Sequence, residues 1–113
     1  MAFENLIRSH PNSYLVGAAW GRIGDCHFTL AASDPARYTK AIESYRQARE
    51  TPGVTEELRM QATFKIGRCY ERLGRTEDAL AHYMEVVYAF WQLRDEGRGA
   101  PAVWFTRAAF AAG

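Results

Sequence analysis

The chain has 113 residues, of which 48% are hydrophobic and 24% are charged, proportions that are ordinary for a soluble globular protein. Lysine and arginine number 14 and aspartate and glutamate 13, and this near-neutral balance argues against a dedicated nucleic-acid-binding protein. The sequence contains no apolar run long enough to cross a membrane, its first residues lack the pattern of a signal peptide, and two cysteines are too few for a disulfide framework.

In chain order, the first predicted helix covers residues 14–32 and the second covers residues 35–50. The stretch SDPAR connects them, with Asp34 expected to cap the second helix and Pro35 to take its first helical position. The sequence TPG at residues 51–53 is expected to end the second helix.

The third predicted helix, residues 56–73, repeats apolar side chains at helical spacing, begins after the capping residue Thr55 and ends at Gly74. A fourth helix is predicted over residues 76–94 and a fifth over residues 101–112. No stretch alternates convincingly in the manner of a β-strand, so the sequence predicts an all-α protein.

Parts of the sequence occur twice. IGDCHF at 23–28 aligns with IGRCYE at 66–71, and KAIESYRQA at 40–48 aligns with DALAHYMEV at 78–86. The two alignments differ in their offset, which places an insertion in the first copy around AASDPAR. The chain is therefore predicted to hold two copies of a helix–turn–helix unit with connecting turns of unequal length.

Gly67 lies inside the third predicted helix, where a glycine weakens a helix by about 1 kcal/mol relative to alanine. Across the turn it is expected to face Ala79, with Tyr70 and Tyr83 filling the space beside the two small residues. Gly24 takes the same place in the first copy. We therefore interpret these glycines as packing positions that let two helices approach closely, and not as parts of a phosphate-binding loop.

Two further groups of residues are expected inside the structure. Cys26 and Cys69 hold equivalent positions in the two copies and are expected to face the interhelical core as small hydrophobic residues. The aromatic residues of the second helices are expected mostly in the core: Tyr38, Tyr45, Tyr83, Tyr88, Phe90 and Trp91.

The small and aromatic residues of the second copy resemble the signature of the tetratricopeptide repeat family. The matching residues are Gly67, Tyr70, Gly74, Ala79 and Tyr83. In the first copy His27 stands where the aromatic residue belongs, and Trp104, Phe105 and Ala108 resemble the opening of a third copy. The resemblance implies a right-handed α-solenoid of antiparallel helix pairs, with about two full repeats and partial helices on either side.

The resemblance also implies a division of the single domain 1–113. Residues 1–12 would be a partial helix of a preceding repeat, 13–52 the first repeat, 53–97 the second, and 98–113 the first helix of a further repeat, which indicates a fragment of a longer chain. The phrase AFENLIRSHPNS is similar to repeats of bacterial periplasmic tetratricopeptide proteins, such as those associated with the Tol-Pal system and the outer-membrane assembly lipoproteins. That similarity implies the bacterial periplasm or cell envelope, with the cytoplasm as the alternative.

In this family the first helix of each unit lines a concave surface that binds extended peptides or partner helices. Carried over by register, the expected groove residues are Ala18, Gly21, Arg22, Asp25 and Phe28 in the first copy and Gln61, Phe64, Lys65, Arg68 and Arg72 in the second. The basic side chains, with Phe64 beside them, would bind acidic side chains or a C-terminal carboxylate. The alternative is that they are solvated surface charges, with Arg68 and Glu71 simply neighbours on one helix.

The last predicted helix is apolar almost all round and needs cover from another surface. Its large side chains are Trp104, Phe105 and Phe110. Either the chain is part of a longer solenoid or a second copy covers this helix, which predicts a homodimer through exposed repeat ends.

Residues that carry chemistry are few. The candidates are His10, His27, His82, Cys26 and Cys69, and they show no spacing typical of a zinc site or of a catalytic triad. We therefore expect no enzymatic activity, no cofactor and no metal. The leading expectation is a module that binds a protein or peptide; a structural or self-associating spacer of a larger envelope protein is the alternative, and RNA binding is the least favoured.

Overall fold

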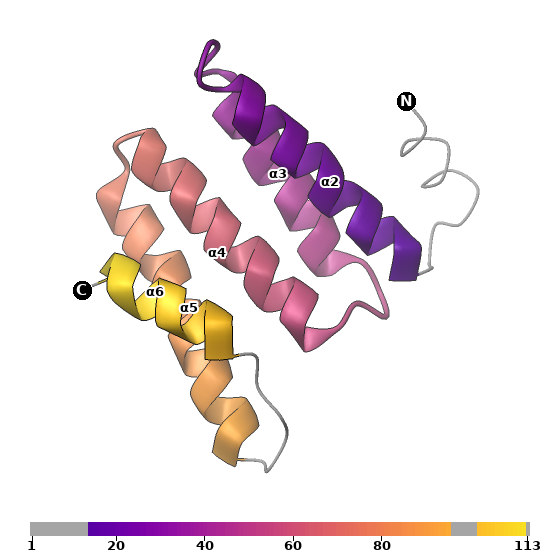
Figure 1. The fold of residues 1–113 in the computed structure, drawn as a ribbon, viewed down its shortest axis with the longest axis vertical. Coiled ribbons are helices and arrows are strands. Elements are labelled where there is room, and N and C mark those ends of the chain that lie inside the picture. The colour runs from indigo at the N-terminus through magenta and orange to yellow at the C-terminus, as the bar shows by residue number, and fades with distance from the viewer. Residues whose placement is uncertain (1–13, 96–101, 113) are drawn as a thin grey trace.

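The computed structural model describes residues 14–95 and 102–112. It contains helices α2 (Tyr14–Leu30), α3 (Arg37–Glu50), α4 (Glu56–Arg72), α5 (Thr76–Asp95) and α6 (Ala102–Ala112) (Figure 1). No strand occurs in the described part of the chain, so the predicted all-α class is confirmed. The bounds of the five predicted helices also agree closely with those observed.

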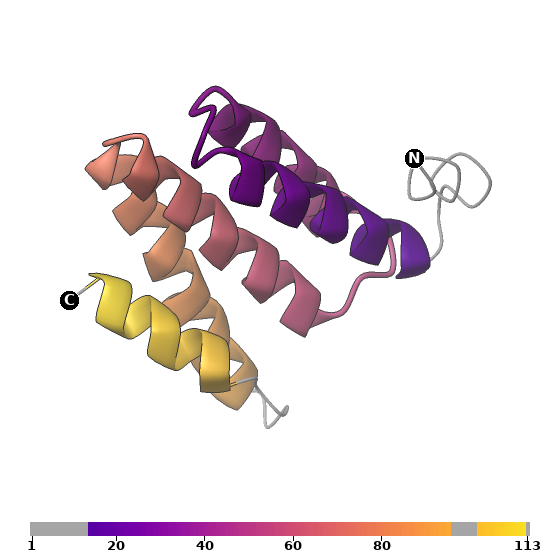
Figure 2. The same cartoon turned by 45° about the horizontal axis from the view of Figure 1, so that its top comes forward.

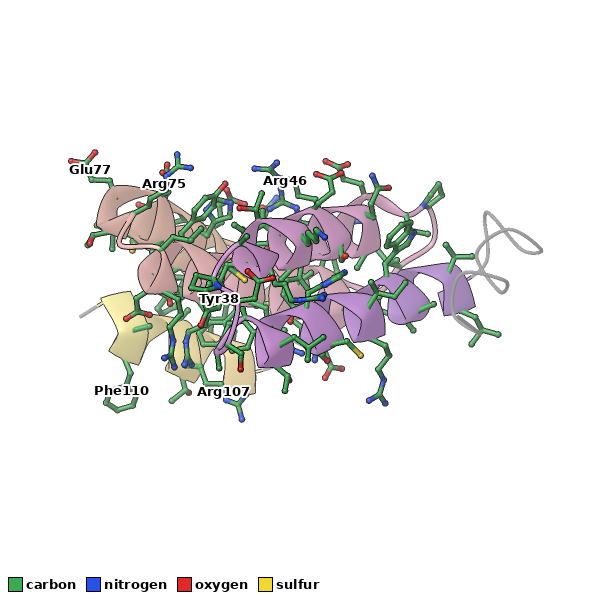
Figure 3. The ribbon with its side chains drawn as sticks, turned by 90° about the horizontal axis from the view of Figure 1, so that it is seen from above. Tyr38, Arg46, Arg75, Glu77, Arg107 and Phe110 are labelled. Atoms are coloured by element: carbon green, nitrogen blue, oxygen red, sulfur yellow. The ribbon has the colours of Figure 1, made fainter. Side chains whose placement is uncertain are left out.

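The helices form two layers. Helices α2, α4 and α6 lie in one layer, and α3 and α5 lie behind them in the other (Figures 1 and 3). Each helix packs against the next one in the chain, and α4 also contacts both α2 and α6 within its own layer (Figure 2). Helix α6 therefore follows α5 in the same way that α4 follows α3, which is the arrangement of a helical repeat protein.

The helix ends follow from particular residues. Thr55 is the N-cap of α4, and its hydroxyl accepts a hydrogen bond from the backbone N–H of Leu58 at 3.1 Å, as predicted. Gly74 follows α4 with a φ of 78°, and the N–H of Arg75 donates to the carbonyl of Tyr70 at 2.9 Å, a Schellman ending that requires a left-handed residue.

The predicted cap of α3 is wrong. The helix begins at Arg37, and its N-cap is Ala36, which makes no side-chain capping bond. Asp34 instead accepts through its backbone carbonyl from the N–H of Arg37 at 2.9 Å, and Pro35 accepts in the same way from Tyr38 at 3.1 Å. These tight turns take up the extra residues of the longer first connection, so the Asp34 side chain is not needed as a cap.

Both helical glycines are packing positions, as predicted. A Cβ on Gly67 would lie 2.7 Å from the Tyr83 ring and 3.3 Å from the carbonyl oxygen of Ala79, and a Cβ on Gly24 would lie 2.5 Å from the Tyr45 ring. A tyrosine of the second helix therefore lies directly over the glycine of the first helix in each pair.

The side chain of Tyr70 is not among the nearest neighbours of Gly67, where the sequence analysis expects it. Its hydroxyl accepts a hydrogen bond from Arg46 of α3 at 3.0 Å, and its ring centroid is 5.2 Å from that of His82. It thus contacts α5 within its own helix pair and also joins that pair to α3 of the first pair.

Two expectations about the core are only partly met. Cys69 is buried but Cys26 is exposed, because α4 has described helices on both sides whereas, among the described helices, α2 packs against α3 and α4 alone. Tyr38, Tyr45 and Tyr83 are buried, yet Tyr88 is 65% exposed and Trp91 is 43% exposed, since α5 lies near the end of the described stack. The position of a helix within the stack therefore decides whether equivalent residues are covered.

Candidate functional site

Two hollows open on the α2, α4 and α6 side of the molecule. The first hollow, about 300 Å³, lies between α2 and α4 and is lined by Ala18, Gly21, Arg22, Asp25, Tyr45, Leu58, Gln61, Ala62 and Lys65. The second hollow, about 730 Å³, lies between α4 and α6 and is lined by Phe64, Arg68, Glu71, Arg72, Thr106, Arg107, Phe110 and Ala111. Helix α4 contributes one side of each hollow.

The predicted groove residues divide between these hollows. Arg22, Gln61 and Lys65 line the first hollow, whereas Arg68 and Arg72 line the second. The basic side chains that the sequence analysis places in one groove therefore form two separate groups.

The two aromatic residues expected in the groove, Phe28 and Phe64, each pack against a tyrosine. Phe28 is half-buried and lines neither hollow, and its ring lies edge-on to Tyr38 with centroids 5.5 Å apart. Phe64 lines the second hollow but is only 6% exposed, and its ring is 5.5 Å from that of Tyr83. Phe64 is therefore a wall of the hollow and not a projecting anchor.

A network of polar side chains crosses the first hollow from α2 to α3 and α4. Asp25 Oδ1 accepts from the Tyr45 hydroxyl at 2.7 Å and from Lys65 Nζ at 2.8 Å. Burial, and then the hydrogen bond to Asp25, raises the pKa of Tyr45, so its hydroxyl remains protonated and donates. The exposed Arg22 has no ion pair among the described residues.

The second hollow contains a related but looser arrangement. Glu71 Oε1 accepts from the Tyr83 hydroxyl at 2.7 Å, and Arg68 Nε is 3.9 Å from the same oxygen. Burial, and then the hydrogen bond to Glu71, raises the pKa of Tyr83, so this hydroxyl also remains a donor. Arg72 is exposed, and no ion pair joins it to a carboxylate in the described part of the chain.

The face formed by the two hollows is basic. Five basic and two acidic side chains line them, in a chain whose net charge is only +1. Both carboxylates already accept a hydrogen bond from a buried tyrosine. Arg107 and Phe110 project from α6 on the side opposite α3 and α5, so α6 adds both charge and apolar surface to this face (Figure 3).

The sequence analysis predicts neither the tyrosine–carboxylate hydrogen bonds nor the place of Arg107 in the second hollow. One signal for the former was available, because Tyr45 and Tyr83 occupy equivalent positions in the two copies and each faces a helical glycine. A hydroxyl beyond that ring must reach a polar partner if the ring is buried, and an acidic residue lies near both glycines in the sequence. Arg107 had no comparable signal, since its place depends on how α6 docks.

The predicted self-association residues are described in part. Phe110 is 83% exposed beside the second hollow, whereas Ala108 on the opposite side of α6 is fully buried. Trp104 and Phe105 belong to α6, and their side chains lie outside the described residues. Helix α6 thus covers part of its own apolar surface against α5.

Residues with catalytic or metal-binding chemistry do not gather in the described residues. Burial raises the pKa of the Cys69 thiol to about 12, which keeps it protonated and unreactive. His27 accepts at Nδ1 from Arg37 at 3.3 Å, and His10 lies outside the described residues. Among the described side chains, no three His, Cys, Asp or Glu residues are placed to hold a metal ion, and no helix has the length and hydropathy to cross a bilayer.

Comparison with known proteins identifies the family to which this chain belongs. Residues 30–101, more than half of the chain, match the tetratricopeptide repeat family, and the chain belongs to that family. Tetratricopeptide repeats are generally protein-interaction modules. No curated protein and no solved structure matches the chain.

Proposed function

We propose that the α2, α4 and α6 face binds an extended acidic segment of a partner protein. The observation that supports this proposal is the excess of basic side chains along the two hollows, five against two acidic ones, while the chain as a whole is nearly neutral. Complementary charge steers an acidic segment to such a face and fixes its register there.

The second hollow offers a ligand both a charged group and apolar surface. Arg72 is exposed and without a carboxylate partner among the described residues, so its guanidinium is available to form a bidentate bond with a carboxylate. Phe64, Phe110 and Ala111 line the same hollow. The preferred ligand therefore carries an apolar side chain next to an acidic one.

A self-associating structural segment of a larger bacterial envelope protein is the second candidate function. The exposure of Phe110, at 83%, favours it, because a large apolar side chain at the end of a helical stack is typical of a surface that a further protein surface covers. A dimeric mass of the peptide-free protein, lost on the substitution Phe110→Glu, would support this candidate.

Binding of defined peptides tests the proposed function. The probes are fluorescein-labelled octapeptides of Glu, Asp, Leu and Phe, compared with the same peptides carrying Lys in place of every acidic residue. We expect the acidic set to bind more tightly, and the substitution Arg72→Glu to weaken that binding by about tenfold. Affinity should also fall as salt is added, because the attraction is between partly exposed charges.

Lys40→Glu is the matched control. Lys40 is exposed on α3 and lines neither hollow, and the substitution makes the same change in charge. It should change the affinity less than twofold. Equal binding of acidic and basic peptides, or equal effects of the two substitutions, would rule out this face as an acidic-segment site.

A further inference from the structure

The two hollows differ in charge at one repeated position. Asp25 directly follows the packing glycine Gly24, and Arg68 directly follows the equivalent Gly67. Each lines its own hollow, so the repeat places a carboxylate in the first hollow where it places a guanidinium in the second.

Asp25 compensates the charge of Lys65. The ammonium is 2.8 Å from Asp25 Oδ1 and 5.8 Å from the centroid of the Tyr45 ring, and the Lys65 side chain is only 25% exposed. A carboxylate from a ligand could pair with this ammonium only by competing with Asp25, which Tyr45 holds in place through the same oxygen.

In the second hollow, Arg68 has no such tight pair among the described residues. Arg68 is 3.9 Å from Glu71, whose own oxygen already accepts from Tyr83 at 2.7 Å. Arg72, one helical turn further along α4, is exposed and has no ion pair within the part of the chain that the structure describes. Arg22 of the first hollow also has no ion pair among the described residues, but the first hollow has two basic side chains and one acidic one, whereas the second has three basic side chains and one acidic one. The second hollow is therefore the more favourable one for a ligand carboxylate.

We propose that Asp25 sets the charge selectivity of the groove by holding the ammonium of Lys65, so that the acidic residue of the ligand is directed to the second hollow. This inference rests on the proposed function of the face. It gives the bound segment a direction, with its acidic end over α4 and α6 and a neutral polar end over α2 and α4.

The substitution Asp25→Asn tests the proposal with little change in shape. The asparagine amide oxygen still accepts from the Tyr45 hydroxyl, but its negative charge is gone. We expect the acidic octapeptides to bind about fivefold more tightly to this variant, as the loss of one partly exposed ion pair would allow. Peptides with Gln and Asn in place of Glu and Asp should bind the variant and the wild type equally.

Lys65→Met provides the complementary variant. In the Asp25→Asn background it should return the affinity for acidic peptides to the wild-type value, because the released ammonium is the source of the gain. In the wild-type background it should change that affinity less than twofold. Circular dichroism at each step verifies that every variant keeps the same helical content.

The outcomes separate the inference from the proposed function. If Asp25→Asn leaves the ratio of acidic to neutral peptide affinity unchanged while Arg72→Glu still weakens acidic binding, the role of Asp25 is overturned and the acidic-segment site stands. A large loss on Lys65→Met alone would likewise overturn it, since Lys65 would then already pair with the ligand. If neither the wild type nor Asp25→Asn binds any acidic peptide, both proposals fail.

Discussion

The two helix pairs make the same contact with different acidic residues. In the first pair Tyr45 lies over Gly24 and donates to Asp25, one residue further along α2. In the second pair Tyr83 lies over Gly67 and donates to Glu71, four residues further along α4. The position of the ring is fixed by packing, whereas its hydroxyl binds whichever carboxylate lies within reach.

This difference teaches how a repeat can vary in function without varying in fold. The residue after the glycine is not required for packing, so it can be Asp25 in one copy and Arg68 in the other. Its side chain nevertheless lines the groove in both copies. Charge along the groove is therefore adjustable repeat by repeat, while the glycine and the tyrosine maintain the helix pair.

The largest expected effect comes from filling a packing glycine. Gly67→Val should lower the free energy of unfolding by about 3 kcal/mol, because a Cβ there would already lie 2.7 Å from the Tyr83 ring and 3.3 Å from a backbone oxygen of the facing helix. Urea denaturation followed by circular dichroism measures the change.

The same substitution at Gly21 is its control. Gly21 is helical, and no atom lies within 4 Å of the position its Cβ would take. Gly21→Val should therefore leave the stability unchanged or raise it by a few tenths of a kcal/mol, since valine is a better helix former than glycine. Equal destabilisation by the two substitutions would contradict the packing role of Gly67.

Removing the tyrosine hydroxyls should have an intermediate effect. Tyr45→Phe should destabilise the protein by about 1.5 kcal/mol and Tyr83→Phe by about 1 kcal/mol, because each loses a hydrogen bond to a carboxylate and keeps its ring. The first effect is larger because Tyr45 binds an oxygen shared with Lys65, which joins the two repeats. Thermal and urea unfolding of both variants measure these changes; a larger loss for Tyr83→Phe would reverse the comparison.

The smallest expected effect is a dependence on pH from His27, which takes the place that Tyr70 has in the second copy. Burial, and then the charges of Arg37 and Lys40, lowers the pKa of His27 below its ordinary value of 6.5. As the pH falls through 6.5, the unfolded chain therefore takes up a proton more readily than the folded protein, and stability falls.

The substitution His27→Gln isolates this contribution. The free energy of unfolding, measured between pH 7.5 and 5.5, should fall less steeply for this variant than for the wild type. An identical slope in both proteins would show that other groups cause the pH dependence.

Local signals were sufficient to predict the helices and the packing glycines. Helical periodicity, Thr55 and Gly74 act within a few residues, and the cap and the Schellman ending both occur where they are expected. The offset between copies also identifies Gly24 and Gly67 as equivalent, because the same packing problem recurs in each pair. Repetition thus supplied tertiary information that a single copy would not contain.

Contacts between repeats could not be predicted in this way. The ion pair between Asp25 and Lys65 joins residues 40 positions apart, and it depends on the distance and angle between α2 and α4, which no local pattern encodes. The exposure of Cys26 and Tyr88 has a related cause, since equivalent residues are buried or exposed according to which neighbours their helix has. Phe28 lines neither hollow, and register alone does not say which of two faces a half-buried aromatic residue turns to.

Contacts in this molecule join each helix mainly to the helices before and after it in the chain. Folding therefore needs only short loops to close, and an end helix such as α6 can separate while the contacts of α2, α3 and α4 persist. The same organisation gives the family a modular route to new binding surfaces. Each added helix pair contributes one more hollow, and the residue that follows its glycine is one of those that set the charge of that hollow.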